Sequence, residues 1–141
     1  MYEKKPWLKF YDKHIPEHIE YLRTTMYNAV FNTSEKYPDS IAYDFMGYES
    51  TYKQLIEEID QCAKALFNLG LRKGDRMTIA MPTTPQGVIC FYAINKIGGI
   101  ASMIHPLSPP KQIKFFLNLS KYSIPLLFSA LPKVIKGPAL V

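Results

Sequence analysis

The heptapeptide MPTTPQG, residues 81–87, lies between an apolar stretch that suits a strand and one that suits a helix. Such a junction can hold a phosphate, because a helix N-terminus offers free N–H groups and the positive end of the helix dipole. A P-loop also needs a long glycine-rich bend and a lysine that reaches the phosphates. Residues 81–87 contain one glycine, and the next lysine is Lys96. We therefore interpret the heptapeptide as a helix start, with Thr84 as the N-cap and Pro85 in the first turn, and not as a nucleotide loop.

Among the histidines, His105 is our candidate ligand contact. It follows a predicted buried strand, and ligands bind outside the carboxyl ends of strands in parallel α/β sheets. The alternative is that His105, which precedes Pro106, is a turn residue. His14 and His18 have the i, i+4 spacing of a metal-binding pair, but Pro16 argues against a helix between them and no third ligand is near. We predict no metal site.

No other set of residues indicates catalysis. The sequence order supports neither a Ser-His-Asp nor a Cys-His arrangement, and Glu57 and Glu58 are predicted to lie on a solvated helix face. Cys62 and Cys90 lack metal-binding spacing, and both fall in apolar helical patterns, so we expect buried, reduced thiols. We predict no catalytic and no cofactor-binding residue in this chain.

The composition is that of a soluble globular protein, with 141 residues, 48% of them hydrophobic and 21% charged. The N-terminus has no apolar core of the kind that marks a signal peptide. The longest apolar region, residues 87–104, is interrupted by Asn95 and Lys96, which argues against a transmembrane span. We expect a cytoplasmic protein.

Charge is divided unequally along the chain. Residues 1–75 contain ten basic and twelve acidic residues, whereas residues 76–141 contain seven basic residues and no acidic one. A basic half favours an anionic partner, such as a nucleic acid, a lipid surface or a phosphorylated ligand. Because five of these charges are single lysines spread over residues 111–136, we expect no nucleic-acid binding. Peripheral membrane contact through the aromatic and basic N-terminal arm stays open.

The elements that would position these residues fall into two predicted regions. Residues 1–23 form an N-terminal arm that we expect to lie across the body, and residues 24–141 form a partial α/β subdomain. The body begins with a predicted helix over residues 25–37, a hairpin turning at Gly47 and a helix over residues 51–69. The last of these helices starts with the capping-box pattern of Thr51 and Gln54 and is followed by Gly70.

The second half of the chain alternates short apolar strands with helices. Buried strands are predicted over residues 77–81, 100–104 and 124–128, and helices over residues 86–97 and 111–120. This alternation predicts right-handed βαβ units, and hence an α/β fold with a parallel sheet and flanking helices.

Five stretches in this order resemble a known family: TYKQL (51–55), ALFNLGLRKGDRM (65–77), IAMP (79–82), AINKIGGI (93–100) and HPLSPPKQIKFFL (105–117). Together they resemble the N-terminal part of the acyl-adenylate-forming (AMP-dependent) synthetases, and among these the long-chain fatty-acid–CoA ligases. The resemblance covers residues 24–123 and implies the first subdomain of an adenylate-forming ligase fold. Thr83 and His105 stand where family members often have Asn, and the tail after Ser123 matches poorly.

The resemblance implies an acid–thiol ligase that activates a fatty acid with ATP and Mg²⁺ and passes the acyl group to CoA. The family's Ser/Thr/Gly-rich loop with its Lys, and its Glu, Asp and C-terminal Lys, have no match in this chain, and the loop is expected beyond residue 141. We therefore expect an N-terminal fragment that is inactive alone and whose partner is the remainder of the ligase chain. The alternative is a stand-alone ligase-derived module that binds a partner protein or an anionic ligand. The two differ in solution behaviour, because the cut sheet of a fragment should expose an unpaired edge and favour self-association.

Overall fold

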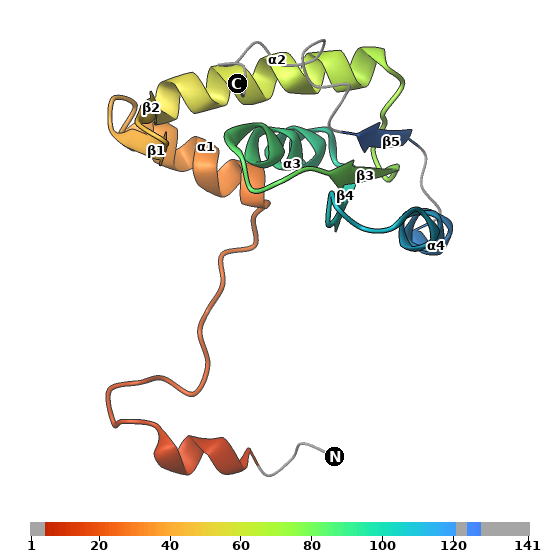
Figure 1. Cartoon of the computed structure of the whole chain (residues 1–141). Helices are drawn as coiled ribbons and strands as arrows, with labels where there is room; N and C mark the ends of the chain where they lie inside the picture. Colours follow the sequence, from red (N-terminus) through yellow and green to blue (C-terminus); the bar gives the residue numbers. More distant parts are fainter. Residues whose placement is uncertain (1–4, 121–123, 128–141) are drawn as a thin grey trace.

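The computed structural model describes residues 5–120 and the backbone of residues 124–127 (Figure 1). The predicted strand end at residue 128 and the tail beyond it lie outside the described residues. The elements in chain order are the 3-10 helix η1 (Pro6–Phe10), α1 (Met26–Lys36), β1 (Ile41–Phe45), β2 (Tyr48–Thr51), α2 (Tyr52–Asn68), β3 (Arg76–Ala80), α3 (Pro85–Ile97), β4 (Ile100–Ile104), α4 (Pro110–Ser120) and β5 (Ile124–Leu127).

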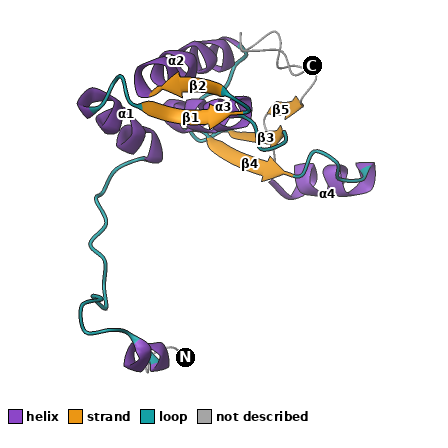
Figure 2. Ribbon diagram, turned by 60° about the vertical axis from the view of Figure 1, so that its left-hand side comes forward, coloured by secondary structure: helices purple, strands orange, loops and turns teal. Residues whose placement is uncertain are grey.

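Three parallel strands form the sheet, in the order β4-β3-β5. Met77 of β3 pairs with Ala101 of β4 and with Ile124 of β5. Helix α3 connects β3 to β4 on one side of β3, and α4 connects β4 to β5 on the other side. Such parallel crossovers are right-handed in nearly all proteins. The two helices therefore lie on opposite faces of the sheet (Figures 1 and 2). The predicted α/β fold with a parallel sheet and flanking helices is confirmed.

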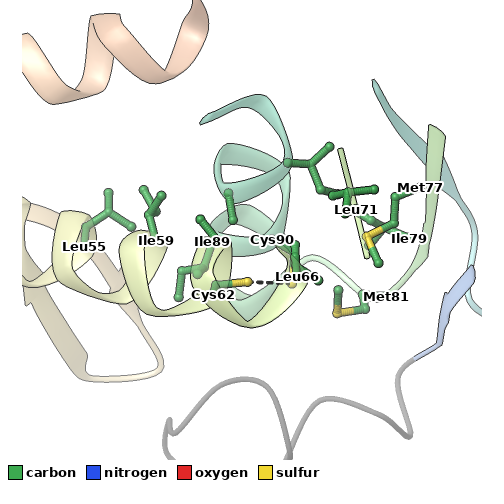
Figure 3. Packing of buried hydrophobic residues seen from close by; sticks show 13 residues of the cluster. Leu55, Ile59, Cys62, Leu66, Leu71, Met77, Ile79, Met81, Ile89 and Cys90 are labelled. Carbon is green, nitrogen blue, oxygen red and sulfur yellow. Dashed lines mark hydrogen bonds between the residues drawn. The ribbon is translucent and has the colours of Figure 1, made fainter. Parts of the chain in front are cut away.

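The core lies where α2 and α3 pack against each other and against β3 (Figure 3). Helix α2 starts with the predicted capping box, because Thr51 Oγ1 accepts from the Gln54 N–H and Gln54 Oε1 accepts from the Thr51 N–H. The fully buried residues with 0% exposure are Ile59, Cys62, Leu66, Leu71, Met77, Ile79, Cys90, Ala93 and Ile94.

A second, antiparallel sheet consists of the predicted hairpin of β1 and β2. Its two-residue turn has positive φ at both positions, 54° at Met46 and 84° at Gly47, as a turn whose twist matches a hairpin requires. The hairpin packs beside the first turns of α2, so that it covers one end of the core.

The N-terminal arm differs from our expectation. It does not lie across the body, but projects away from it and ends in η1 (Figures 1 and 2). Its apolar side chains are open to solvent, with exposed fractions of 79% for Phe10, 82% for Tyr21 and 88% for Leu22. The prolines and the absence of a regular apolar pattern leave the arm without a face that could pack on the body.

Strand β4 also differs from the prediction of a buried strand. Ile100 is 48% exposed and Met103 is 54% exposed, because β4 is an edge strand whose neighbour among the described strands is β3 alone. Within the part of the chain that the structure describes, no helix has the length and apolar character needed to cross a membrane.

Candidate functional site

The carboxyl ends of β3 and β4 bring together the two stretches that the sequence singles out. β3 leads into residues 81–84 and then α3, and β4 leads directly into His105. The chain passes from β3 to β4 on one side and then crosses to β5 on the other, so the direction of winding changes at β3. In open α/β sheets ligands bind outside the carboxyl ends of the strands at such a point.

The side chain of His105 is exposed at this edge and is held in a turn. Its Nδ1 accepts a hydrogen bond of 3.2 Å from the Leu107 N–H, and its carbonyl accepts one of 3.1 Å from the Ser108 N–H. Because Nδ1 is the acceptor, the neutral ring carries its proton on Nε2. The turn that we considered as the alternative is therefore present, and it leaves Nε2–H as the donor that a ligand would meet.

A cavity of about 460 Å³ opens beside His105, between β4 and α4. Its size falls in the range of small-molecule sites. The walls combine hydroxyl and amide groups with apolar side chains, among them Ser102, Ser108, Gln112, Phe116 and Leu119. The cavity can therefore accommodate a partly apolar ligand with hydrogen-bonding groups.

The heptapeptide MPTTPQG forms the predicted helix start, but not by the predicted contact. Thr84 occupies the N-cap position and Pro85 opens α3, and the Thr84 carbonyl accepts from the Gly87 N–H at 3.0 Å. The Thr84 side chain makes no capping hydrogen bond. It is 6% exposed and its Oγ1 has no hydrogen-bond partner, because the side chain is turned into the protein rather than over the first turn.

Glu58 is a second correction, because it does not lie on a solvated face. It is half-buried under β1, and Tyr43 Oη donates to Glu58 Oε2 at 3.1 Å. Burial raises the pKa of Glu58, and burial together with this carboxylate raises the pKa of Tyr43 to about 12. The pair joins the hairpin to α2, and no local sequence signal reveals a contact that spans 15 residues.

The two cysteines are buried free thiols, as predicted. Cys62 Sγ and Cys90 Sγ lie 3.7 Å apart between α2 and α3 (Figure 3). The hydrogen bond to Cys62 and burial raise the pKa of the Cys90 thiol, so the thiol stays protonated and unreactive. Among the residues that the structure describes, no three His, Cys, Asp or Glu side chains gather where they could hold a metal ion.

Sequence reasoning missed a polar junction of three helices. Lys96 of α3 forms an ion pair with Asp60 of α2 and lies 4.8 Å from the ring centroid of Tyr27 in α1. Asn95 Oδ1 accepts from the Tyr27 N–H at 2.9 Å. The signal was present, because Asn95 and Lys96 interrupt the apolar pattern near the C-terminal end of this helix.

The sequence is similar to proteins that are named as CoA ligases and CoA synthetases. The chain is 30% identical over 141 residues to a long-chain-fatty-acid–CoA ligase of Bacillus subtilis, which covers 99% of this chain and 25% of that protein. It is 42% identical over 84 residues to the 3-hydroxypropionyl-coenzyme A synthetase of Sulfurisphaera tokodaii, or 55% of this chain and 13% of that one. The chain thus spans about a quarter or less of these relatives.

The fold is also similar to that of a solved structure. The N-terminal subdomain of Klebsiella oxytoca NpsA superposes with a TM-score of 0.71 at 25% identity, over 82% of this chain and 29% of that one. Residues 30–137 match the family described as AMP-binding enzyme, which is most of the chain. The predicted resemblance to the adenylate-forming synthetases is confirmed, and the chain belongs to the AMP-binding enzyme family.

Proposed function

We propose that this chain is the N-terminal part of an ATP-dependent fatty-acid–CoA ligase. The observation that carries the proposal is the match to the Bacillus subtilis ligase, which extends over 99% of the chain and so includes the N-terminal arm. The match to the Sulfurisphaera tokodaii protein supports the same class of reaction with a different acyl group. We extend the proposal to the division into an arm, residues 1–23, and a body, residues 24–141.

The whole ligase would carry out two steps that the family resemblance implies. A fatty-acid carboxylate attacks the α-phosphate of ATP, which gives an acyl-adenylate and releases pyrophosphate. The thiol of CoA then attacks the acyl carbon, which gives the thioester and releases AMP. The start of α3 does not fit the phosphates, because residues 81–87 contain no lysine and Lys96 is paired with Asp60.

In this proposal the chain supplies a scaffold and one ligand contact. His105 would donate from Nε2 to a ligand group at the cavity between β4 and α4. The remainder of the ligase would pack on the apolar surface that β4 and α4 leave open, where Met103 is 54% exposed and Leu119 is 67% exposed. The fatty acid, ATP, Mg²⁺ and CoA would bind with residues of that remainder.

A chimera tests the proposal. The matching quarter of the Bacillus subtilis ligase is replaced by this chain, and acyl-CoA formation from palmitate, ATP and CoA is measured. We expect an active chimera, an inactive isolated chain, and a chimera carrying His105→Ala with reduced kcat/KM. The matched control is His105→Asn, which restores a side-chain donor and should recover activity. Thioester formation by the isolated chain, or a folded but inactive chimera, would contradict the proposal.

The alternative function is a stand-alone module that binds an anionic ligand or a partner protein. It is favoured by α4, which has no buried residue and exposes Lys111 and Lys114 in a half of the chain without acidic residues. A monomeric chain that binds acidic ligands, together with a folded but inactive chimera, would support this alternative.

A further inference from the structure

Cys62 of α2 and Cys90 of α3 are in direct contact where the two helices pack together (Figure 3). Their sulfur atoms lie 3.7 Å apart, and both residues are fully buried. The sulfurs of a disulfide lie about 2.05 Å apart, so a bond would require an approach of about 1.7 Å. The two thiols are therefore placed to form a bond after a small rearrangement.

The packing around the pair favours a close approach of the helices. Ala63 follows Cys62 on α2, Ala93 lies one turn after Cys90 on α3, and both alanines are buried. The distance between packed helices depends on the size of the side chains at their contact. Among the described elements, α2 and α3 make the most extensive contact. Small residues at this contact favour the separation of less than about 7 Å that a disulfide requires between its Cα atoms.

The closed interior protects the two thiols from reaction. A thiol reacts as the thiolate, and the hydrogen bond to Cys62, together with burial, raises the pKa of the Cys90 thiol. An oxidant therefore meets a thiolate when α2 and α3 separate locally, and such local openings occur in native proteins. Reclosure of the helices then returns the second sulfur to contact with the first.

We propose that Cys62 and Cys90 form a reversible disulfide in the presence of hydrogen peroxide, and that this bond locks α2 to α3. The thiolate of one cysteine attacks the O–O bond, which gives a sulfenic acid and, with one proton, releases water. The other thiol attacks the sulfenic sulfur, the S–S bond forms, and the hydroxyl leaves with the thiol proton as a second water. The two thiols lose two electrons, and one peroxide is reduced to two waters.

The bond would close a loop that contains the central strand of the sheet. Residues 62–90 include β3 and the heptapeptide MPTTPQG, so the bond would join the two helices that pack against β3. A disulfide across such a loop restricts the unfolded chain and thereby stabilises the folded one. The lock would act on the interior as a whole, and it is independent of the ligase function proposed above.

The experiment treats the folded 141-residue chain with hydrogen peroxide and counts its free thiols after unfolding in urea. We expect the count to fall from two per chain to zero and to return to two after dithiothreitol. Trypsin places the cysteines in separate peptides, residues 54–64 and 77–96, and mass spectrometry should find these peptides joined. A chain that keeps two thiols, that links to a second chain, or whose thiols dithiothreitol does not restore would overturn the proposal.

Thermal unfolding tests whether the bond fits the native packing. The oxidised monomer should keep the circular dichroism spectrum of the reduced chain and unfold about 5 °C or more above it, and dithiothreitol should reverse this shift. Cys90→Ala is the control for oxidation of methionines by peroxide, because it keeps all of them and has one thiol. Its midpoint should not rise. A bond that lowers the midpoint of the wild type, or an equal rise in Cys90→Ala, would overturn the proposal.

A double variant separates the contact from the mere presence of two cysteines. Cys62→Ala combined with Ala63→Cys moves one thiol by a single residue, or about 100° around α2, to a position that is also buried. Cysteines whose Cβ atoms point apart cannot be bridged without backbone movement, so its disulfide should form about tenfold more slowly or not at all. Equal rates in the wild type and this variant would overturn the proposal. If the variant does not fold, the thiol count and midpoint of the wild type still decide.

Discussion

Strands β3 and β4 have the same length, run parallel and pair residue by residue, yet they differ in burial. Met77 and Ile79 of β3 are 0% exposed, whereas Ile100 and Met103 of β4 are half exposed. Both strands are rich in apolar residues. Their positions differ, because among the strands that the structure describes β3 lies between β4 and β5, whereas β4 pairs with β3 alone.

The helices show the same contrast. α2 and α3 each have five buried residues, and they meet in the core, whereas α4 has none. Phe115 of α4 is 60% exposed and Leu119 is 67% exposed. The α/β body therefore has a packed interior of α2, α3 and β3 and an open border of β4 and α4.

The largest expected effect tests the interior against the border. Ile79→Ala removes a fully buried side chain and should lower the free energy of unfolding by about 2–5 kcal/mol. Met103→Ala changes the β4 residue that pairs with Ile79, and it should cost less than ~1 kcal/mol, since half of the side chain is already in water. Urea unfolding followed by circular dichroism measures both. Equal losses in the free energy of unfolding for the two variants would show that β4 is covered in solution.

The next effect concerns the connection between interior and border. Gly98 ends α3 with φ of 83°, and an added Cβ would lie 3.1 Å from Lys73 Cγ. Gly98→Ala should therefore cost about 1–2 kcal/mol for the left-handed backbone, with a further contribution from crowding. Gly74→Ala is the control, because Gly74 has φ of 87° with nothing near the added Cβ. If Gly74→Ala lowers the free energy of unfolding more than Gly98→Ala does, the added Cβ at position 98 is not crowded by Lys73.

A smaller effect is expected at the polar junction of the interior. Lys96→Met keeps most of the side chain but loses the ion pair with Asp60. Because the side chains of Lys96 and Asp60 are 32% and 38% exposed, the free energy of unfolding should fall by about 0.2–1 kcal/mol. Lys64→Met, an exposed site on α2, serves as the control. A larger loss would indicate that the three helices depend on this junction.

The pH dependence of the same variant has a defined sign. Burial lowers the pKa of Lys96, but Asp60 and Tyr27 outweigh it, so the pKa in the folded state is raised above 10.5. The charged lysine therefore stabilises the fold fully below pH 10.5, and this contribution is lost as the pH rises through the folded-state pKa. The difference between wild type and Lys96→Met should shrink above that pH.

The smallest effect on stability is expected at the open border. Met103→Lys places a charge on the edge strand, and its free energy of unfolding should stay within ~0.5 kcal/mol of the wild type. We expect the wild-type chain to self-associate through this edge, and the added lysine to oppose this. Sedimentation velocity measures the change, with Met26→Lys, on exposed α1, as the control. Equal behaviour of the two variants would remove β4 from the interface.

Local signals predicted the elements closely. The helix predicted over residues 51–69 spans Tyr52–Asn68, and the strand predicted over 100–104 spans Ile100–Ile104. The reason is that caps, prolines and glycines act within a few residues of the chain, as the capping box of Thr51 and Gln54 does. The location of His105 at the carboxyl edge of the sheet followed from the same alternation of strands and helices.

The features that sequence reasoning missed depend on distant neighbours. Glu58 has a helix-surface pattern, and its burial comes from Tyr43 in a different element. Thr84 has the right type and place for a side-chain cap, but its hydroxyl is buried and makes no capping hydrogen bond. No window of sequence shows which distant neighbours surround a residue, so these two features could be found from the structure alone.

The buried cysteine pair between α2 and α3 can report when this part of the core opens. Cys62 and Cys90 are 0% exposed, so an alkylating reagent can reach them only when the two helices separate. The modification rate, compared with that of an unfolded thiol, therefore gives the free energy of this opening directly. Because these are the chain's two cysteines, labelling needs no engineered probe, and the kinetics show whether the interior opens as one cooperative unit or frays from the border inward.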